Sequence, residues 1–332
     1  MRGSSGKTGG LSTPSMDNPE SRESRDLRRA GRSGCGRGTE GSADSDPPRG
    51  ICGLFRLRGG RVVGRLGRGI TIKVGLSRIS VALHEGDRIL RMRTWKTPPP
   101  GEAESLRPFF SALWPDISSK DIPSVLVCVV PDLAEPVALL WEARSGQRPD
   151  PFALSHAPFS VDYRPPESLG ADRGAAVWGA LVRFGEILDP AFMVADFGTH
   201  TVTTVCFEGR LLGGAILPGL SLMEKSLGAG RVNLSGKGRL LDRERLSRCR
   251  ALGRSTVDGV FSGVVLGSVL AVEALGRRAE EELGIPLRIV LTGGMAPVVA
   301  PLFKSEVLVS RQVVHYGAWS FLSGNRDFFP ET

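Results

Sequence analysis

A pattern of three short apolar strands joined by glycine turns occurs twice in this chain, with the copies about 120 residues apart. The first copy has its apolar runs at 70–77, 79–84 and 88–95, and the second at 194–197, 200–207 and 211–216. Consecutive strands of this kind pair as an antiparallel meander. Because a supersecondary unit that is used twice leaves such self-similarity, the sequence predicts two similar halves.

The segments around the two meanders predict a sheet covered by helices. Residues 124–131 form a continuous apolar run closed by proline, which is typical of a strand buried on both faces. Helices are expected over 103–113, 174–184 and 256–283, and a further strand over 287–291. The sequence therefore predicts an α/β fold with a parallel, helix-covered sheet.

The basic charge of the chain is concentrated at its beginning. The whole chain has a net charge of +8, and residues 1–68 carry 14 Lys/Arg against 7 Asp/Glu, a net charge of +7. This segment has few apolar residues, so we expect a disordered basic tail. An RNA-binding arm and a start codon placed too far upstream are alternatives. The acidic residues interleaved with the basic ones reduce the positive charge that an RNA-binding arm would need. Because the remainder is nearly neutral, we expect no nucleic-acid partner and no membrane partner.

Cysteine usage and hydropathy favour the cytoplasm. The five cysteines are scattered and show no Cys-x-x-Cys spacing, which argues against a disulfide framework and against a zinc site. The N-terminus shows no secretory signal. The most apolar long run, 257–275, is interrupted by polar residues and is interpreted as a buried helix rather than a membrane span.

Two polar turns suit the chemistry of a phosphate group, and an acid at the start of a helix is a third candidate feature. Asp196, Gly198 and Thr199 place a carboxylate, a bare backbone and a hydroxyl at the end of one strand, and Gly293-Gly294 follows another strand. Asp172 stands at the start of the helix over 174–184. Each motif also has a simpler interpretation, since ordinary tight turns contain such residues and an acid commonly caps a helix.

Taken together, these motifs resemble those of the type III pantothenate kinases, which belong to the superfamily of acetate kinase, sugar kinases, actin and the heat-shock ATPases. The resemblance extends from about Ile70 to Phe321. Its most specific elements are the segments 163–173, 196–199, 212–219 and 292–296, together with Thr256 and Gly263. Several motifs in the correct order are far more specific than any one of them.

The resemblance implies two ribonuclease-H-like lobes around a nucleotide cleft, with the disordered tail at 1–68, one lobe at 69–185 and the other at 186–332. It also implies the use of ATP, Mg²⁺ and a monovalent cation, K⁺ or NH₄⁺. Pantothenate would lie beside residues 170–173. A homodimer is expected as well, because family members pair and the helix after Gly263 carries small residues that could pack closely.

The roles of individual residues follow from the same resemblance. Asp172 would be the general base for the primary hydroxyl of the substrate, and Asp196 would hold the metal ion. The residues expected to bind the substrate are Tyr163, Gly170, Ala171, Arg173 and Thr256. Those expected to bind ATP and its phosphates are Gly75, Ser77, Gly198, Thr199, Gly293 and Gly294.

The chain departs from the family at several positions. The first phosphate motif of the family reads Asp-x-Gly-Asn-Thr, and here Lys73 stands at its aspartate and Leu76 at its asparagine. His200 replaces a small residue, and Thr204 stands where the family usually has an acid. A lysine at position 73 could neutralise phosphate directly, but it does not order a hydrated magnesium ion as aspartate does.

Two functions follow from these observations. The first is the ATP-dependent phosphorylation of pantothenate to 4'-phosphopantothenate, the first step of coenzyme A biosynthesis. The alternative is a catalytically impaired homologue with a regulatory or accessory role. The complete Gly-Ala-Asp-Arg motif at 170–173 disfavours a sugar or carboxylate kinase of the same superfamily.

Overall fold

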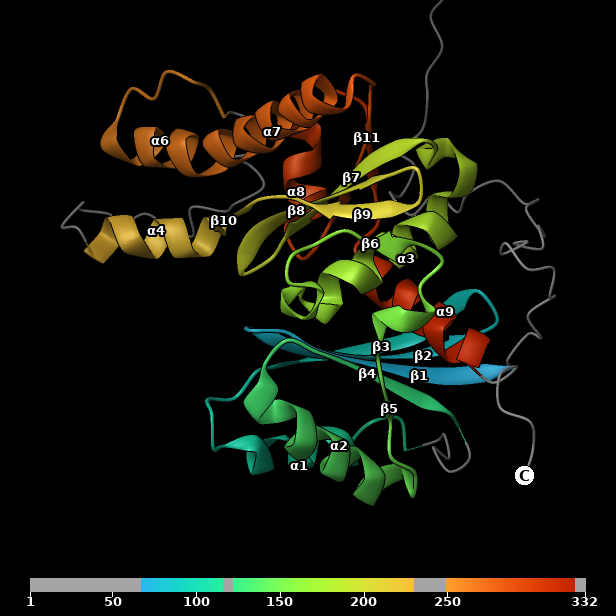
Figure 1. Cartoon of the computed structure of the whole chain (residues 1–332). Coiled ribbons are helices and arrows are strands. Elements are labelled where there is room, and N and C mark those ends of the chain that lie inside the picture. The colour runs from blue at the N-terminus through green and yellow to red at the C-terminus, as the bar shows by residue number, and fades with distance from the viewer. Residues whose placement is uncertain (1–66, 116–121, 230–248, 326–332) are drawn as a thin grey trace, which may run out of the picture. The chain divides into compact units, whose positions relative to one another are not determined.

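Two sheets that share one order of five strands form the framework of the protein, and the second sheet has two further strands (Figure 1). The computed structural model describes residues 67–115, 122–229 and 249–325, all within one unit of the chain, residues 54–332. The first sheet has the order β3-β2-β1-β4-β5, with β1 (Arg68–Val74), β2 (Arg78–Glu85), β3 (Arg88–Lys96), β4 (Ser124–Cys128) and β5 (Asp150–Pro151). The predicted disordered tail, 1–68, lies outside the described residues except for its last two positions.

The second sheet repeats this arrangement. Its order is β12-β11-β7-β8-β9-β6, with β10 paired to β8. Its strands are β6 (Ser160–Val161), β7 (Ala191–Phe197), β8 (His200–Phe207), β9 (Arg210–Gly213), β10 (Ile216–Pro218), β11 (Arg288–Thr292) and β12 (Val307–Val309). In each half an antiparallel meander is extended by two strands that run parallel to its first strand. The predicted duplication and the α/β fold of two ribonuclease-H-like halves are therefore confirmed.

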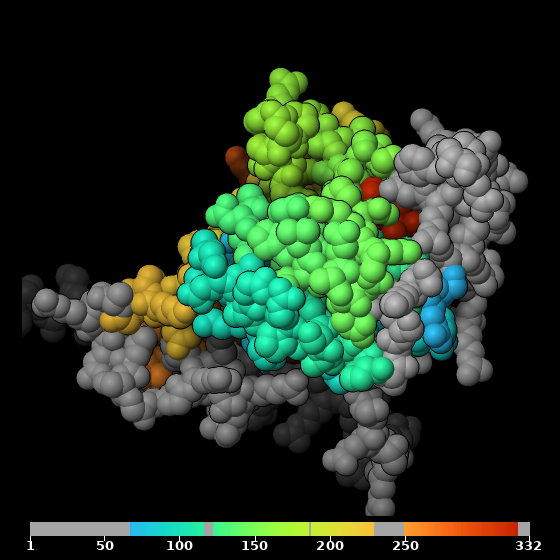
Figure 2. All heavy atoms as spheres, turned by 90° about the horizontal axis from the view of Figure 1, so that it is seen from below, coloured from blue at the N-terminus to red at the C-terminus, as the bar shows by residue number. Residues whose placement is uncertain are grey.

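Helices cover the outer face of each sheet. On the first sheet, α1 (Arg107–Ser111) and α2 (Pro131–Ser145) pack over Ile70, Ile72 and Val74. In the view from below, the teal and green side chains of these helices form the surface (Figure 2). On the second sheet, α7 (Gly267–Leu283) and α8 (Ala296–Val299) pack over β7 and β11. Because side chains alternate between the two faces of a strand, every second residue packs into an apolar core under the outer helices, and each sheet has its own core of this kind.

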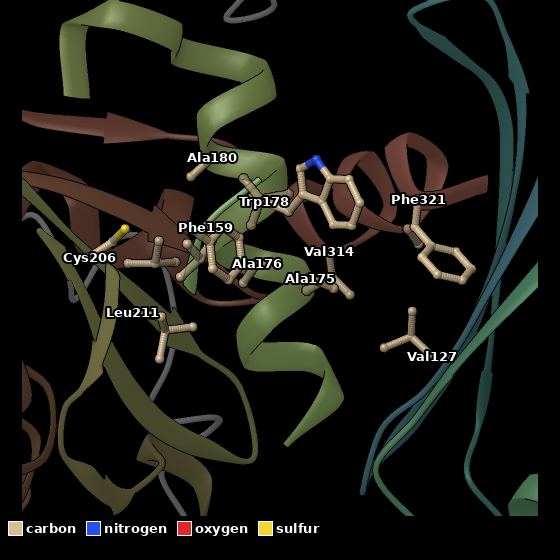
Figure 3. Close-up of a cluster of buried hydrophobic side chains, with 14 of the residues drawn as sticks. Val127, Phe159, Ala175, Ala176, Trp178, Ala180, Cys206, Leu211, Val314 and Phe321 are labelled. Atoms are coloured by element: carbon tan, nitrogen blue, oxygen red, sulfur yellow. The ribbon is translucent and has the colours of Figure 1, made fainter. Parts of the chain in front are cut away.

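A central pair of helices lies between the two sheets. The pair consists of α3 (Ala171–Phe184) and α9 (Val313–Asn325), and its core contains Val127 of β4 together with Leu211 of β9 (Figure 3). The two backbones are in close contact, because a Cβ atom on Gly317 would lie 1.9 Å from the carbonyl oxygen of Ala175. Small residues at the contact between α3 and α9 thus allow a single layer of two helices to pack against both sheets.

The remaining helices of the described residues are α4 (Leu220–Ala229), α6 (Thr256–Phe261) and short 3-10 turns at 103–106, 154–156, 166–168, 185–188 and 300–302. The predicted helix over 256–283 is confirmed, although a π-helical turn at 262–266 joins α6 to α7. By length and composition this helix could cross a membrane, but half of its apolar window is buried inside the protein. Val265, Val269 and Val272 are fully buried, which supports its interpretation as a core helix.

Candidate functional site

The first turns of the two repeats meet. In the first half the turn after β1 contains Gly75 and Ser77, and in the second half the turn after β7 contains Gly198 and Thr199. The hydroxyl oxygens of Ser77 and Thr199 lie 2.7 Å apart. The structure therefore brings together four of the residues that the sequence predicts to bind phosphate, from positions more than 120 residues apart.

A third turn lies beside the second of these. Thr292 at the end of β11 pairs with Asp196 on β7, and the turn continues through Gly293 and Gly294. Gly293 has φ +91°, and a Cβ atom there would lie 2.7 Å from the carbonyl oxygen of Phe197, so only glycine fits. The following helix, α8, has four residues, so any anion at this turn would be bound by backbone N–H groups rather than by a helix dipole.

Three charged side chains converge where the turns meet. Lys73 and Asp196 are the second-to-last residues of β1 and β7, and their Nζ and Oδ2 atoms lie 3.7 Å apart. Their side chains are 23% and 20% exposed. Asp172 is in the first turn of α3, and burial raises its pKa. The charge of Lys73 lowers that pKa and the charge of Asp196 raises it, so both charges act on the Asp172 carboxyl.

The N-terminal turn of α3 presents Asp172 and Arg173. Gly170 is the N-cap residue, Ala171 is the first helical residue, and the carbonyl oxygen of Gly170 accepts a hydrogen bond from Arg173 N. Because α3 is packed between the two sheets and Arg173 bonds to Thr203 and Thr204, its first turn is held against β8. The predicted catalytic residue therefore stands on a rigid element.

The guanidinium of Arg173 is buried and held by neutral groups. Its Nε donates to Thr204 Oγ1 at 3.1 Å, and its Nη2 donates to the carbonyl oxygen of Thr203 at 3.2 Å. The Nη1 atom donates to the Tyr163 hydroxyl at 3.3 Å, and the cation lies 5.1 Å from the centre of that ring. A buried cation held in this way is well suited to bind a carboxylate.

One predicted substrate residue lies elsewhere. Thr256 begins α6, is exposed, and belongs to a helix that packs on the opposite face of the second sheet from α3. Within this chain the structure therefore groups Tyr163, Gly170, Ala171 and Arg173 around Asp172 but does not bring Thr256 to them.

The donor set near Asp196 does not fit a divalent cation held by the protein. Magnesium takes six oxygen ligands and is commonly bound through carboxylates. In the described part of the chain, no group of three or more His, Cys, Asp or Glu side chains could hold a metal ion by protein ligands alone, so magnesium would depend on one carboxylate and the nucleotide phosphates. The carboxylate of Asp196 already has the ammonium of Lys73 beside it, and that charge would repel a metal ion.

A buried polar network adjoins the site on β1, and no local sequence pattern predicts it. Thr71, two residues before Lys73, contacts two histidines: its hydroxyl lies 3.0 Å from His84 Nε2 and 2.7 Å from His315 Nδ1. The other ring nitrogen of His315 lies 2.8 Å from the Ser80 hydroxyl. Strand alternation predicts that Thr71 and Lys73 share a face, but no local pattern predicts that a histidine more than 240 residues away covers it.

Comparison with known proteins agrees with these observations. The family model of type III pantothenate kinase matches residues 69–278. A type III pantothenate kinase from Parafrankia sp. (strain EAN1pec) is 30% identical over 242 residues, which cover 72% of this chain and 90% of that protein. A type III pantothenate kinase from Chlorobium chlorochromatii (strain CaD3) is 30% identical over 269 residues, which cover 77% and 96%.

A solved structure shows a similar fold. The structure of a conserved Baf family protein from Campylobacter jejuni has a TM-score of 0.51 and is 17% identical, and the match covers 78% of this chain and 99% of that protein. At this level of identity the likeness concerns the arrangement of strands and helices only.

Proposed function

The chain belongs to the type III pantothenate kinase family, and on that premise we propose that it transfers the γ-phosphoryl group of ATP to the primary hydroxyl of pantothenate. The product is 4'-phosphopantothenate, and the reaction is the first step of coenzyme A biosynthesis. The observation that carries this proposal is the position of Asp172, a partly buried carboxylate in the first turn of α3 that adjoins the buried guanidinium of Arg173 and feels the charges of Lys73 and Asp196.

Asp172 is suited to act as the general base. Burial raises its pKa, and a carboxylate with a raised pKa takes a proton from an alcohol more readily than an ordinary aspartate does. The accepted proton comes from the hydroxyl oxygen that attacks phosphorus. Because Asp172 stands on the packed helix α3, its oxygen atoms are held in place before the substrate binds.

Arg173 is suited to hold the substrate in position. Pantothenate carries a carboxylate as well as its primary hydroxyl, and a guanidinium binds a carboxylate with two parallel hydrogen bonds. Its neighbours Tyr163 and Thr204 fix the orientation of the guanidinium. Two adjacent residues of one helix would then have complementary roles: Arg173 would bind the carboxylate of pantothenate, and Asp172 would accept the proton of its hydroxyl.

The nucleotide phosphates would bind at the three turns. The backbone N–H group of Gly294 and the hydroxyls of Ser77 and Thr199 are donors suited to phosphate oxygens, whereas the N–H groups of Gly75 and Gly198 already donate to the carbonyl oxygens of Arg78 and His200 and shape their turns. Magnesium supplies charge neutralisation of the phosphates when it accompanies ATP. The monovalent cation expected from the family resemblance stays a prediction.

We also propose that the enzyme acts in the cytoplasm as a homodimer. The exposed surface of α6 and the following turn supports pairing, because Gly259 and Gly263 stand in open space where a second backbone could approach. Light scattering at micromolar concentration tests this proposal, and a monomer mass would contradict it.

A coupled assay tests the proposed reaction. Purified protein is incubated with MgATP, and ADP release is followed with and without pantothenate, with glucose and acetate as matched alternative acceptors. The proposal predicts ADP release that depends on pantothenate and yields one phosphorylated product per ADP. The absence of pantothenate-dependent ADP release from folded protein would contradict it and would favour the regulatory alternative.

A further inference from the structure

The position of Lys73 points to an additional role in the phosphoryl transfer. The ammonium approaches Asp196 to 3.7 Å, which is longer than a hydrogen bond. An ammonium has three N–H donors. Since the pairing with Asp196 is electrostatic rather than a close hydrogen bond, these donors remain available to a ligand that enters the site.

The surroundings of Lys73 are those of a phosphate site. Lys73 stands two residues before Gly75, on the strand that leads into the first turn, while Asp196 occupies the equivalent place before Gly198. The hydroxyl pair of Ser77 and Thr199 bridges the same two turns. A phosphoryl group bound at these turns would therefore lie within reach of the ammonium.

The ammonium of Lys73 also lies beside the carboxylate that a divalent metal ion would need as a ligand. The strand-end carboxylate of Asp196, the natural ligand for such an ion, is paired with Lys73. A divalent ion on this carboxylate would have a positive charge as its immediate neighbour. The same charge is attractive to the oxygens of a transferred phosphoryl group, which carry the negative charge of the transition state.

We propose that Lys73 is the resident cation of the transfer site: its ammonium, held by Asp196, contacts the non-bridging oxygens of the γ-phosphoryl group in place of a divalent ion bound by the protein. This inference rests on the proposed kinase function. It makes Lys73 a catalytic residue and Asp196 the residue that positions it.

The transfer step balances with Lys73 in this role. The hydroxyl oxygen of the substrate forms a bond to the γ-phosphorus, and the bond from that phosphorus to the bridging oxygen breaks, leaving its electron pair on ADP. The hydroxyl proton passes to Asp172. Lys73 stays protonated throughout and stabilises the charge on the three non-bridging oxygens.

Two binding measurements test the proposal without turnover. In the first, Mn²⁺ is titrated into nucleotide-free protein and free Mn²⁺ is followed by electron paramagnetic resonance. Wild type is expected to bind no Mn²⁺ at the site, whereas Lys73→Asp is expected to gain a binding site. Binding of Mn²⁺ by wild type that is lost in Asp196→Asn would overturn the proposal.

In the second measurement, a non-hydrolysable ATP analogue is titrated by calorimetry in the presence of EDTA. Lys73→Met is expected to weaken binding roughly tenfold or more, as for the loss of a charge-assisted hydrogen bond, and Lys73→Arg is expected to restore part of the loss. The matched control is Lys304→Met, which removes an exposed lysine in the loop before β12 and is expected to leave affinity unchanged. Equal affinity of folded Lys73→Met and wild type would overturn the proposal.

These outcomes are independent of the reaction itself. If the binding results are as expected but no pantothenate-dependent turnover is seen, the proposed function fails while the role of Lys73 in phosphate binding stands. If turnover is seen but Lys73→Met binds the analogue as wild type does, the proposed function stands and the role of Lys73 fails.

Discussion

The hydroxyl of Thr71 lies 2.7 Å from Nδ1 of His315, so the first strand of the fold is tied to the last described helix by a buried hydrogen bond. Thr71 also contacts His84, whose ring stacks on Trp319 of the same helix at a centroid distance of 5.1 Å. This network fixes α9 against β1 two residues before Lys73. The network therefore stabilises the packing of α9 on β1 and also holds in place the strand that carries Lys73.

The two histidines of this network make stability depend on pH. Burial lowers the pKa of His84 to about 3 and holds the pKa of His315 well below 6.5. Both rings stay neutral in the folded protein, whereas histidines of the unfolded chain take up protons below about pH 6.5. The free energy of unfolding should therefore fall as pH decreases from about 6.5 toward 3, by up to about 1.4 kcal/mol per pH unit for each histidine.

Urea unfolding at a series of pH values measures this slope. His84→Phe retains an aromatic ring against Trp319 but cannot titrate, and it should reduce the slope by up to about 1.4 kcal/mol per pH unit. His156→Gln is the control for the loss of an exposed histidine. An unchanged slope in His84→Phe would show that this imidazole is not neutral in the folded protein.

Close packing of α9 on α3 predicts a contrast between two glycines of the same helix. Gly317→Ala places a methyl group against the carbonyl of Ala175, so it should lower the free energy of unfolding by about 1–3 kcal/mol. Gly324→Ala meets no atom within 4 Å and should be neutral or stabilising by no more than about 1 kcal/mol. Chemical denaturation measures both, and equal effects would contradict the packing.

The charge of Lys73 should also be visible in the pH dependence of catalysis. Because Lys73 lowers the pKa of Asp172, its removal in Lys73→Met should raise that pKa. The acid limb of kcat/KM, which falls as the base becomes protonated, should then move to higher pH in the residual activity of the variant. A limb that stays in place or moves to lower pH would contradict the proximity of these two charges.

Arg173 should act on substrate binding. Arg173→Lys keeps the charge but loses the paired donors, so KM for pantothenate should rise roughly tenfold or more while affinity for nucleotide stays the same. Calorimetry with the ATP analogue and steady-state kinetics separate the two effects. Loss of nucleotide affinity with an unchanged KM for pantothenate would indicate that Arg173 contacts ATP rather than pantothenate, which would contradict the prediction.

Local patterns in the sequence were sufficient to predict the repeated meander, because the alternation of apolar residues in strands and the glycines of turns are properties of short segments. The long helix over 256–283 was predicted for the same reason, although the π-helical turn at 262–266 was not. The family resemblance then pointed to Asp172 and Arg173 as the candidate base and the candidate substrate-binding residue. These features depend on residues that are neighbours along the chain.

Contacts between distant segments could not be predicted in this way. The ion pair of Lys73 with Asp196 joins strands of different sheets, and the contact of Thr71 with His315 joins the two ends of the fold. Each arises only when the duplicated halves come together around α3 and α9. The sequence showed that Lys73 differs from the family motif, but its partner was visible only in the structure.

The turnover of Asp172→Asn tests the central claim most directly. This change removes the base but keeps the shape of the side chain, so kcat for pantothenate phosphorylation should fall about a hundredfold or more while affinity for the ATP analogue stays within a factor of about two. The measurement is 4'-phosphopantothenate formation under saturating MgATP, with thermal unfolding as the check that the variant is folded. A folded Asp172→Asn protein that retains the turnover of wild type would contradict the account.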